Sequence, residues 1–266
     1  LQRAGHEVTN VDLVPSHFGD RQFQVDVRFS EALIPILMQH GTDAVFHIAA
    51  VANARKALEH PVEAVDINIK GTASVLEAAR RAEVKRVFLA STVWVYNAVN
   101  QHSRAGVITE DEPILMNGGG HVYTTSKIAS ELLCHDFHRL YGLPFTILRY
   151  GIPYGPRMWP GLALRTFLDN SFSGKPITIF GDGSAVRQFV YVEDLAHAHV
   201  LALQPVAIGQ TYNLEGDRSV TVKELAETVA KFVKGVKIEY VIDPARRGEM
   251  KVSRPISSTK AKKELG

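Results

Sequence analysis

The sequence has almost no cysteine, no long hydrophobic run and almost no net charge, and each absence excludes a class of protein. Cys134 is the only cysteine among 266 residues, so an internal disulfide is excluded, as is typical of the reducing cytoplasm. No apolar run reaches the roughly 18 residues that a membrane-spanning helix needs, and no secretory signal peptide is visible. The formal net charge is +2 without a basic run, which argues against binding to nucleic acid or an anionic membrane. We therefore expect a cytoplasmic protein that binds neither.

Short apolar segments with the length of strands recur along the chain, separated by segments with helical periodicity. Because the apolar segments do not alternate with polar residues, they predict strands buried on both faces, as in a parallel sheet. A β-α-β-α order of this kind predicts a doubly wound α/β sheet. The expected strands are residues 6–13, 44–50, 86–91, 145–150 and 211–214, and the expected helices are residues 62–82 and 126–141.

The pattern becomes less regular after Tyr150. Proline and glycine are frequent between residues 152 and 184, which favours loops and a smaller lobe. Thr221 and Glu224 form a capping box for a further helix, which Gly235 ends. We expect a larger domain over residues 1–150, to which residues 185–215 return, and a smaller lobe built from residues 151–184 and 216–266.

Tyr123 and Lys127 are the first pair of candidate catalytic residues. On a helix, residues four apart lie one turn apart on the same face, so the phenol and the ammonium can approach each other. A tyrosine with its usual pKa of about 10 is a poor base at neutral pH, and a nearby cation lowers that value. Taken alone, however, most pairs with this spacing are surface residues.

Two further groups of candidates lie at the ends of expected strands. Ser91 and Thr92 end one strand, at the edge of an open α/β sheet where ligands bind. Asp12 ends another strand, where an acid can bind a ribose hydroxyl, and Asp26 with Val27 could lie near an adenine site. The alternative interpretation of each is a turn or helix-capping residue.

In combination and in this order, these residues resemble the extended short-chain dehydrogenase/reductases, and among them the NAD-dependent nucleotide-sugar epimerase/dehydratase family. The resemblance runs nearly from end to end of the chain. Further segments that carry it are His47-Ile48-Ala49-Ala50, Asn68-Ile69-Lys70-Gly71-Thr72, Leu148-Arg149-Tyr150-Gly151, Tyr154-Gly155-Pro156, Gly181-Asp182-Gly183-Ser184, Arg187 to Asp194, Tyr212-Asn213-Leu214 and Arg247-Gly248-Glu249.

The resemblance implies a Rossmann-type sheet that binds NAD in residues 1–150, with a small C-terminal substrate lobe. Tyr123 would act as general base, Lys127 would lower the pKa of Tyr123 and hold the nicotinamide ribose, and Thr92 would position the substrate hydroxyl. The residues implied to bind NAD are Asp12, Asp26, Val27, Ala49, Ala50, Asn68, Ser91, Tyr123 and Lys127, and those implied to bind the nucleotide-sugar substrate are Thr92, Arg187, Arg246 and Arg247.

The sequence departs from the family's pattern at several places. Dehydratases of the family carry an Asp-Glu pair directly after the catalytic threonine, whereas Val93 and Trp94 stand here, so we expect 4-epimerisation without dehydration. Ile152 stands where the family has an asparagine that contacts phosphate. The first strand and the Gly-rich turn that holds the pyrophosphate are absent, and the chain starts at Leu1 rather than at Met. We expect roughly 20 residues before Leu1 in the complete protein, and poor NAD binding or low stability for this chain alone.

Two other functions stay open, namely an NAD(P)-dependent reductase of a sugar or another carbonyl compound, and a non-catalytic nucleotide-binding or regulatory member of the fold. Asp12 favours NAD over NADP because an acid repels a 2′-phosphate. The histidines and the cysteine lack metal-ligand spacing, so no metal is expected. Family members commonly dimerise through paired helices, so we expect a homodimer with residues 126–141 at its interface. In sugar epimerases of the family, a residue soon after the Arg-Gly-acid motif limits the room for an N-acetyl group on the sugar. That residue aligns here with either Ser253 or Arg254, so the identity of the sugar stays open.

Overall fold

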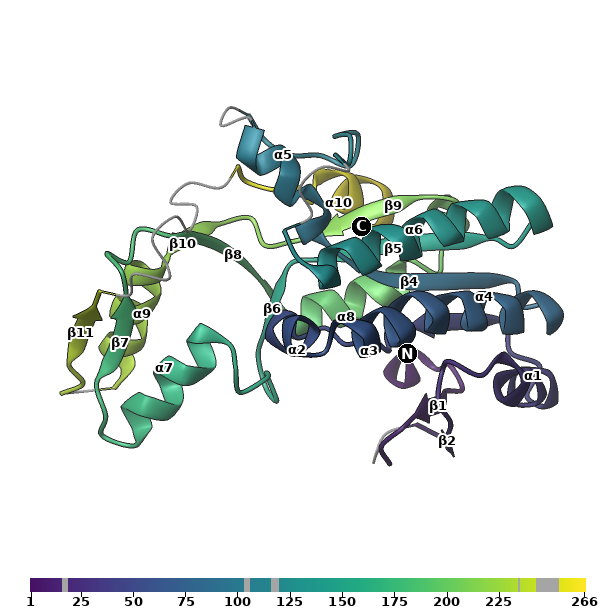
Figure 1. Ribbon diagram of the computed structural model, residues 1–266, viewed down its shortest axis with the longest axis horizontal. Helices are drawn as coiled ribbons and strands as arrows, with labels where there is room; N and C mark the ends of the chain where they lie inside the picture. The colour runs from purple at the N-terminus through teal and green to yellow at the C-terminus, as the bar shows by residue number, and fades with distance from the viewer. Residues whose placement is uncertain (16–18, 103–105, 116–119, 234, 243–253) are drawn as a thin grey trace.

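The computed structural model describes residues 1–15, 19–102, 106–115, 120–233, 235–242 and 254–266 (Figure 1). Its centre is a four-stranded parallel sheet with the strand order β3-β4-β5-β9. The two inner strands are buried along almost their whole length, because helices cover both faces of the sheet. These strands confirm the predicted parallel sheet, although β3 ends at His47 rather than at residue 50. Their bounds are β3 (Ala44–His47), β4 (Arg86–Thr92), β5 (Phe145–Tyr150) and β9 (Thr211–Leu214).

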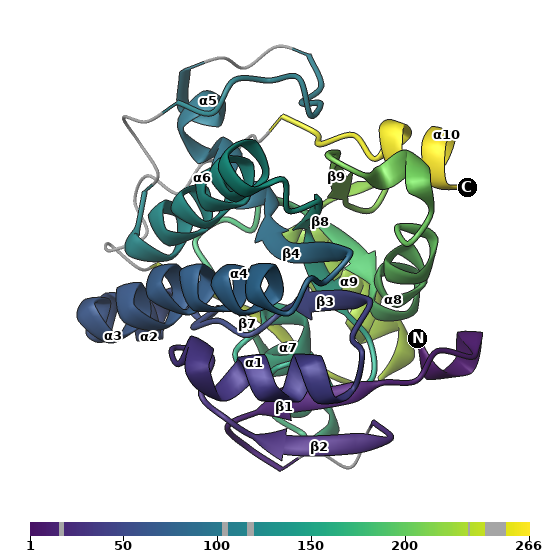
Figure 2. The same cartoon turned by 90° about the vertical axis from the view of Figure 1, so that its right-hand side faces the viewer.

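Helices lie on both faces of this sheet, as a doubly wound fold requires. On one face α4 and α6 pack against β4, and α1 packs beside α4 (Figure 2). On the other face Leu195 of α8 and Leu265 of α10 share a core with Leu148 of β5. The bounds are α1 (Ser30–Gln39), α4 (Gly71–Arg81), α6 (Val122–Tyr141), α8 (Val192–Leu201) and α10 (Thr259–Leu265).

Helix α6 begins earlier than its apolar periodicity predicts. The Nδ1 atom of His121 accepts a hydrogen bond of 3.2 Å from the Thr124 N–H and so caps the helix four residues before position 126. The helix ends as predicted at Gly142, which has a left-handed φ of 71°. Leu132 and Leu140, which share the apolar periodicity of this helix, are nevertheless 52% and 60% exposed. In the described parts of the chain, no helix is long and apolar enough to cross a membrane.

The predicted helix over residues 62–82 is a continuous helical stretch with a π-helical turn inside it. The stretch passes from α3 through the π-turn η2 into α4. Such turns insert one residue into a helix and are frequent at functional sites. Buried Asn68 lies in this turn. The remaining short elements are η1 (Gln2–Ala4), α2 (Ala54–Glu59), α3 (Pro61–Val65), η2 (Asp66–Lys70), η3 (Val93–Tyr96), α5 (Asn97–His102) and η4 (Pro205–Ala207).

The N-terminal strands form a parallel pair of their own, β1 (Thr9–Asp12) with β2 (Arg21–Gln24). Strand β1 is shorter than the predicted residues 6–13. Apolar side chains of β1, β3 and α1 meet in one cluster, so the pair lies beside the main sheet. Within the described residues no strand pairs with the second edge of β1 or of β3.

A three-stranded sheet lies beyond the carboxyl ends of β5 and β9. Its order is β10-β8-β6, with β8 parallel to β6 and antiparallel to β10. The N-cap half of the predicted capping box is confirmed at its edge, because the Thr221 hydroxyl accepts a 3.0 Å hydrogen bond from the Glu224 N–H at the start of α9. The Glu224 carboxylate pairs with Arg218 instead, and α9 ends at Phe232, before the predicted stop at Gly235. The bounds are β6 (Ile152–Tyr154), β8 (Val186–Tyr191), β10 (Ser219–Thr221) and α9 (Val222–Phe232).

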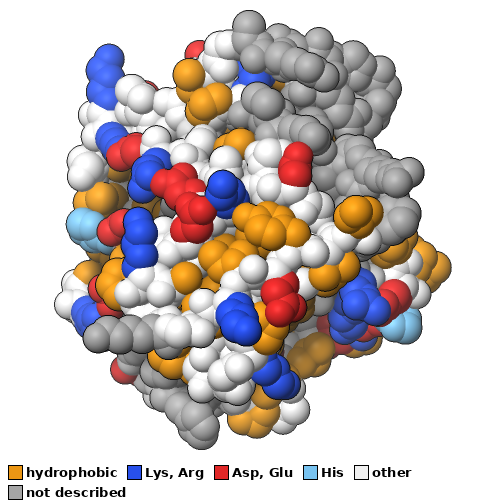
Figure 3. Space-filling view, turned by 90° about the vertical axis from the view of Figure 1, so that its left-hand side faces the viewer, with side chains coloured by type: hydrophobic (Ala, Val, Ile, Leu, Met, Phe, Trp, Pro, Cys, Tyr) orange, Lys and Arg blue, Asp and Glu red, His pale blue; other side chains and the backbone are white. Residues whose placement is uncertain are grey.

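We call the group of α7 (Ala163–Phe172), β7 (Ile177–Phe180), α9 and β11 (Ile238–Val241) the small lobe. It has its own apolar core around Phe167, Ile177 and Val229, and it stands apart from the main sheet (Figure 1). Phe172 and Phe232, at the ends of its helices, are 77% and 84% exposed. Figure 3, which views the molecule from the side of this lobe, shows hydrophobic side chains interspersed with charged ones.

Candidate active site

The site begins at the carboxyl end of β4, where the strand turns into η3. Thr92 is the last residue of β4 and is only 6% exposed. Its hydroxyl accepts a hydrogen bond of 3.3 Å from the Trp94 N–H and thereby caps the short helix. The Thr92 side chain is also hydrogen-bonded to the hydroxyl of Tyr123. The end of β4 thus brings a hydroxyl to the tyrosine that the sequence singled out.

Helix α6 supplies Tyr123 and, one turn later, Lys127. The two side chains are almost fully buried, at 9% and 4% exposure. The Lys127 ammonium donates a hydrogen bond of 2.7 Å to the Ala90 carbonyl of β4. Among the described residues no acceptor takes its two other protons. The structure therefore brings Thr92, Tyr123 and Lys127 together at the carboxyl end of the central strands.

Burial controls the charge states of these groups. It raises the pKa of Tyr123, and the hydrogen bond with Thr92 opposes that effect. It lowers the pKa of Lys127 to about 8, opposed by the charge of Glu131, so the amine is mainly cationic at pH 7. The expected lowering of the Tyr123 pKa by Lys127 is absent in this structure. The physical reason is that the ammonium is directed to the Ala90 carbonyl.

A buried ion pair fixes α6 against the sheet just below this site. Arg149 of β5 donates to both carboxylate oxygens of Glu131, at 3.0 and 2.6 Å. The Ser91 hydroxyl donates to the same carboxylate, so it is directed to α6 rather than to open space. Arg149 also donates to the Tyr96 hydroxyl at 2.5 Å, and Tyr96 donates to Asn213 of β9 at 3.0 Å. These contacts tie β4, β5, β9 and α6 together.

Asn68 holds the loop after β3 in place by hydrogen bonds to the Val51 backbone. The Asn68 carboxamide accepts from the Val51 N–H at 2.7 Å and donates to the Ser126 hydroxyl at 2.9 Å. Its side chain is therefore occupied within the protein. The same contacts fix the loop that carries Ala49, which is exposed, and Ala50, which is half-buried. This small-residue surface lies at the carboxyl end of β3, next to the end of β4.

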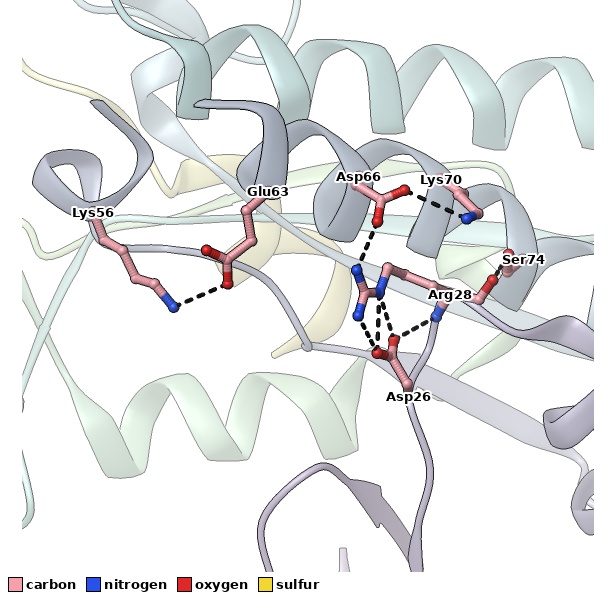
Figure 4. Close-up of polar contacts among 7 residues, drawn as sticks. All are labelled: Asp26, Arg28, Lys56, Glu63, Asp66, Lys70 and Ser74. Carbon is pink, nitrogen blue, oxygen red and sulfur yellow. Dashed lines mark hydrogen bonds and ion pairs between the residues drawn. The ribbon is translucent and has the colours of Figure 1, made fainter. Parts of the chain in front are cut away.

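Asp12, Asp26 and Val27 lie at the edge formed by β1 and β2. The exposed carboxylate of Asp12 accepts from the Val14 N–H at 3.0 Å. Asp26 is bound by Arg28, whose Nη2 atom lies 2.6 Å from the carboxylate; these side-chain hydrogen bonds lower the pKa of Asp26. Arg28 also reaches Asp66 at 2.7 Å (Figure 4).

Val27 packs against the start of α4. A Cβ atom on Gly71 would lie 3.0 Å from the Val27 side chain, so this close approach depends on glycine. The partners of Val27 and Asp26 thus join the loop after β2 to the helical stretch that contains Asn68.

Of the three arginines predicted to bind the diphosphate, the structure describes Arg187. Arg187 lies half-buried on β8, and its Nη1 atom donates to the Val186 carbonyl at 2.8 Å. Arg246 and Arg247 lie outside the described residues, as does Ser253. Arg254 is described and pairs with Glu112 at 2.9 Å.

Several residues at the site were not predicted from the sequence. The ring of Trp94 lies edge-on to His121 and Tyr123, with centroids 5.0 and 6.1 Å apart. Burial and the charge of Tyr123 raise the pKa of Tyr150, and the Tyr150 hydroxyl forms a hydrogen bond with His199. The position of Trp94 two residues after the strand-ending Thr92 was the available signal, whereas His199 comes from a distant helix. Among the described residues no group of His, Cys, Asp and Glu could hold a metal ion.

A hollow of about 380 Å³ lies in the small lobe, lined in part by Ser171, Lys175 and Glu239. It is formed by residues at the ends of α7, β7 and β11 and includes none of Thr92, Tyr123 and Lys127. Its position therefore gives no information about the chemistry at the end of β4.

Comparison with known proteins identifies relatives along most of the chain. The model of the NAD-dependent epimerase/dehydratase family matches residues 1–214. A UDP-glucuronate 4-epimerase of Thermodesulfobacterium geofontis is 33% identical over 223 residues, which are 82% of this chain and 66% of the relative. A dTDP-glucose 4,6-dehydratase of Neisseria gonorrhoeae is 31% identical over 232 residues, 84% of this chain and again 66% of the relative. The chain thus spans just under two thirds of the length of these two curated relatives.

A solved structure also resembles the whole chain. The UDP-glucose 4-epimerase of Thermotoga maritima, crystallised with UDP-glucose, superposes with a TM-score of 0.87 at 28% identity. The match covers 100% of this chain and 86% of that one. The dTDP-glucose 4,6-dehydratase DesIV of Streptomyces venezuelae superposes as well, with a TM-score of 0.83 at 27% identity over 98% of this chain and 81% of that one, so an epimerase and a dehydratase share this architecture.

Proposed function

Since the chain belongs to the NAD-dependent epimerase/dehydratase family, we propose that it is an NAD-dependent 4-epimerase of a nucleotide-diphospho-sugar. The observation that carries the proposal is that buried Thr92, Tyr123 and Lys127 meet at the carboxyl end of β4, where the Lys127 ammonium donates to the Ala90 carbonyl at 2.7 Å and hydrogen bonding to Thr92 opposes the rise that burial causes in the pKa of Tyr123. This arrangement supplies a proton acceptor, a hydroxyl that orients it and a cation in a site shielded from water.

The residues at two places suit NAD. Lys127 has buried N–H groups for which the described residues offer no acceptor, and ribose hydroxyls would satisfy them. Asp12 presents an exposed carboxylate for a second ribose, and Ala49 offers a small side chain beside β4. Asp26 and Asn68, which already bind Arg28 and Val51, would act by holding the surrounding loops in place. Bound there, NAD⁺ would supply the hydride acceptor, and its reduced form the hydride donor, for the chemistry at C4 of the sugar.

The chain's own residues handle the proton. Tyr123 takes the proton of the sugar 4-hydroxyl while the C4–H bond breaks, and it returns the proton when the new C4–H bond forms. Burial keeps the free tyrosine protonated, so this step needs a cation close to the phenolate. Lys127 is charged below its pKa of about 8 and is the cation that α6 places one turn away. The Thr92 hydroxyl would position the sugar 4-hydroxyl against the phenol of Tyr123.

Epimerisation is favoured over dehydration by the two residues that follow Thr92. Elimination of water needs an acid and a base beside the reacting carbons. Val93 and Trp94 provide no titratable group, and the Trp94 ring packs beside Tyr123. This observation supports a proposal of epimerisation over dehydration.

The remaining parts of the chain would bind the substrate and a second copy. We assign NAD binding to residues 1–150 with 185–215, and substrate binding to residues 151–184 and 216–266, with Arg187, Arg246 and Arg247 on the diphosphate because guanidinium matches phosphate oxygens. We also assign a homodimer interface to α6, since Leu132 and Leu140 are more than half exposed. A monomer in light scattering at working concentration would contradict the dimer.

The test is the variant Tyr123→Phe, compared with Tyr141→Phe on the same helix. Tyr141 is 56% exposed and far along α6 from the site, so its loss controls for removal of a phenol. We expect Tyr123→Phe to lower the turnover of a nucleotide sugar at least ~100-fold, because the general base is lost, with NAD content unchanged. Equal turnover in both variants would refute the mechanism.

A further inference from the structure

A buried carboxyl group lies at the same edge of the sheet as the proposed catalytic residues. Glu215 directly follows β9 and is only 6% exposed. Its carboxylate occupies the space over Gly151, the residue after β5, so that a Cβ atom on Gly151 would overlap both carboxylate oxygens. The absence of a side chain at Gly151 thus makes room for this carboxyl group.

The strand register relates Glu215 to the catalytic end of β4. Thr92, Tyr150 and Leu214 are aligned across β4, β5 and β9, so Glu215 is one residue beyond that line. Adjacent strands are about 4.8 Å apart, which puts β9 roughly 10 Å from β4. Asn213 faces the α6 side, where it binds Tyr96, and Glu215 lies two residues further, on the same side of the strand. A sugar at Thr92 is therefore within reach of this edge.

The protein itself leaves the Glu215 carboxyl largely unsatisfied. Its one hydrogen bond within the described residues comes from the Gly216 N–H, at 3.1 Å, and no described cation pairs with it. Burial raises the pKa of Glu215 to about 7. The Nδ2 atom of Asn213, two residues earlier, is buried without a partner in the described structure, whereas neither carboxylate oxygen of Glu215 is both fully buried and unpartnered. A buried amide such as that of Asn213 is normally hydrogen-bonded, and the second oxygen of Glu215 keeps access to an outside partner.

Glu215 also lies where the main sheet meets the three-stranded sheet. The next residue, Gly216, approaches the backbone of Phe189 in β8 so closely that a Cβ atom there would overlap the Phe189 carbonyl. Gln188 of β8 donates to the Gly216 carbonyl at 2.8 Å. The backbone next to Glu215 is therefore held against β8, which also carries Arg187.

We propose that Glu215 determines sugar specificity, an inference that rests on the proposed function. Glu215 would bind an uncharged hydroxyl-bearing substituent of the sugar and exclude a sugar carboxylate. A hydroxyl donates to the carboxylate and satisfies it. A uronate would bring a second negative charge to a buried carboxyl without a counter-ion, and two like charges in such a site disfavour each other strongly. The substrate class is thus a neutral hexose attached to a nucleoside diphosphate.

The test uses NAD-loaded protein and two probes, UDP-glucose and UDP-glucuronate, which differ by a hydroxymethyl group against a carboxylate. Calorimetry at pH 8 gives the dissociation constant of each. We expect wild-type protein to bind UDP-glucose at least tenfold more tightly than UDP-glucuronate. Glu215→Gln keeps the shape and removes the charge, and it should reduce that ratio to threefold or less. Glu83→Gln, at an exposed carboxyl before the amino end of β4, is the matched control and should leave the ratio unchanged.

A second variant reaches the same group without removing its charge. Gly151→Ala places a methyl group where the carboxylate lies, so it should displace Glu215 and change the ratio while NAD content stays normal. A wild-type preference for UDP-glucuronate, or a ratio unchanged in both Glu215→Gln and Gly151→Ala, would overturn the assignment of Glu215 and leave the proposed function standing. Failure of both nucleotide sugars to bind the wild-type protein would overturn both proposals.

Discussion

Replacing Glu215 by glutamine should make the free energy of unfolding much less dependent on pH. Burial raises the pKa of this carboxyl from 4.5 to about 7 in the folded protein. Because the folded state binds the proton more tightly than the unfolded state, the neutral acid contributes stability that is fully present below pH 4.5. That contribution falls as the pH rises through the folded pKa, and it is gone above about pH 7. At about 1.36 kcal/mol per pKa unit, a shift of this size corresponds to about 3 kcal/mol.

The assay is urea unfolding of wild-type and Glu215→Gln protein, followed by tryptophan fluorescence at steps from pH 4.5 to pH 8.5 without ligand. The difference between the two proteins cancels the other titrating groups, so it should shift by about 3 kcal/mol in favour of the variant between the two ends of the range. Glu239→Gln, at the exposed β11 position, controls for the loss of one carboxyl. A difference between wild type and Glu215→Gln that stays constant over the range would show that the carboxyl is not desolvated as described.

Two further predictions concern the framework of the site. Glu131→Gln leaves Arg149 buried without its counter-charge and should cost about 3–5 kcal/mol of unfolding free energy; urea denaturation measures it, and a loss below 1 kcal/mol would contradict the ion pair's role. Thr221→Ala removes the cap of α9 and should cost about 1 kcal/mol, seen in the same assay, whereas unchanged stability would show that the cap is dispensable.

The main sheet was predictable because its strands follow a local rule. The apolar residues of β5 and β9 are buried on both faces without alternation, and their bounds equal the predicted ones. The cap of α9 is also local, since Thr221 and Glu224 are three residues apart. In contrast, the sheet β10-β8-β6 joins short segments far apart in the chain, and no pattern within one segment specifies such a pairing.

The surroundings of the site were less predictable for the same reason. The spacing of Tyr123 and Lys127 brought them to one face of α6 as expected, but the direction of the Lys127 ammonium depends on the Ala90 carbonyl of another element. The buried face of α6 is lined by polar residues such as Glu131 and Ser130, while Leu132 and Leu140 are exposed. Apolar periodicity therefore identifies only part of the buried face, which includes Ile128, because an ion pair and hydroxyl contacts replace hydrophobic packing over the rest.

The most direct test of the central claim is proton NMR of UDP-glucose incubated with the NAD-loaded protein, with absorbance at 340 nm recorded in parallel. The account predicts that the C4 epimer of the sugar accumulates to an equilibrium mixture while NADH stays at or below the amount of bound cofactor. A substrate that is consumed with stoichiometric oxidation or reduction of free cofactor, or one that loses water to give a 4-keto-6-deoxy sugar, would contradict it.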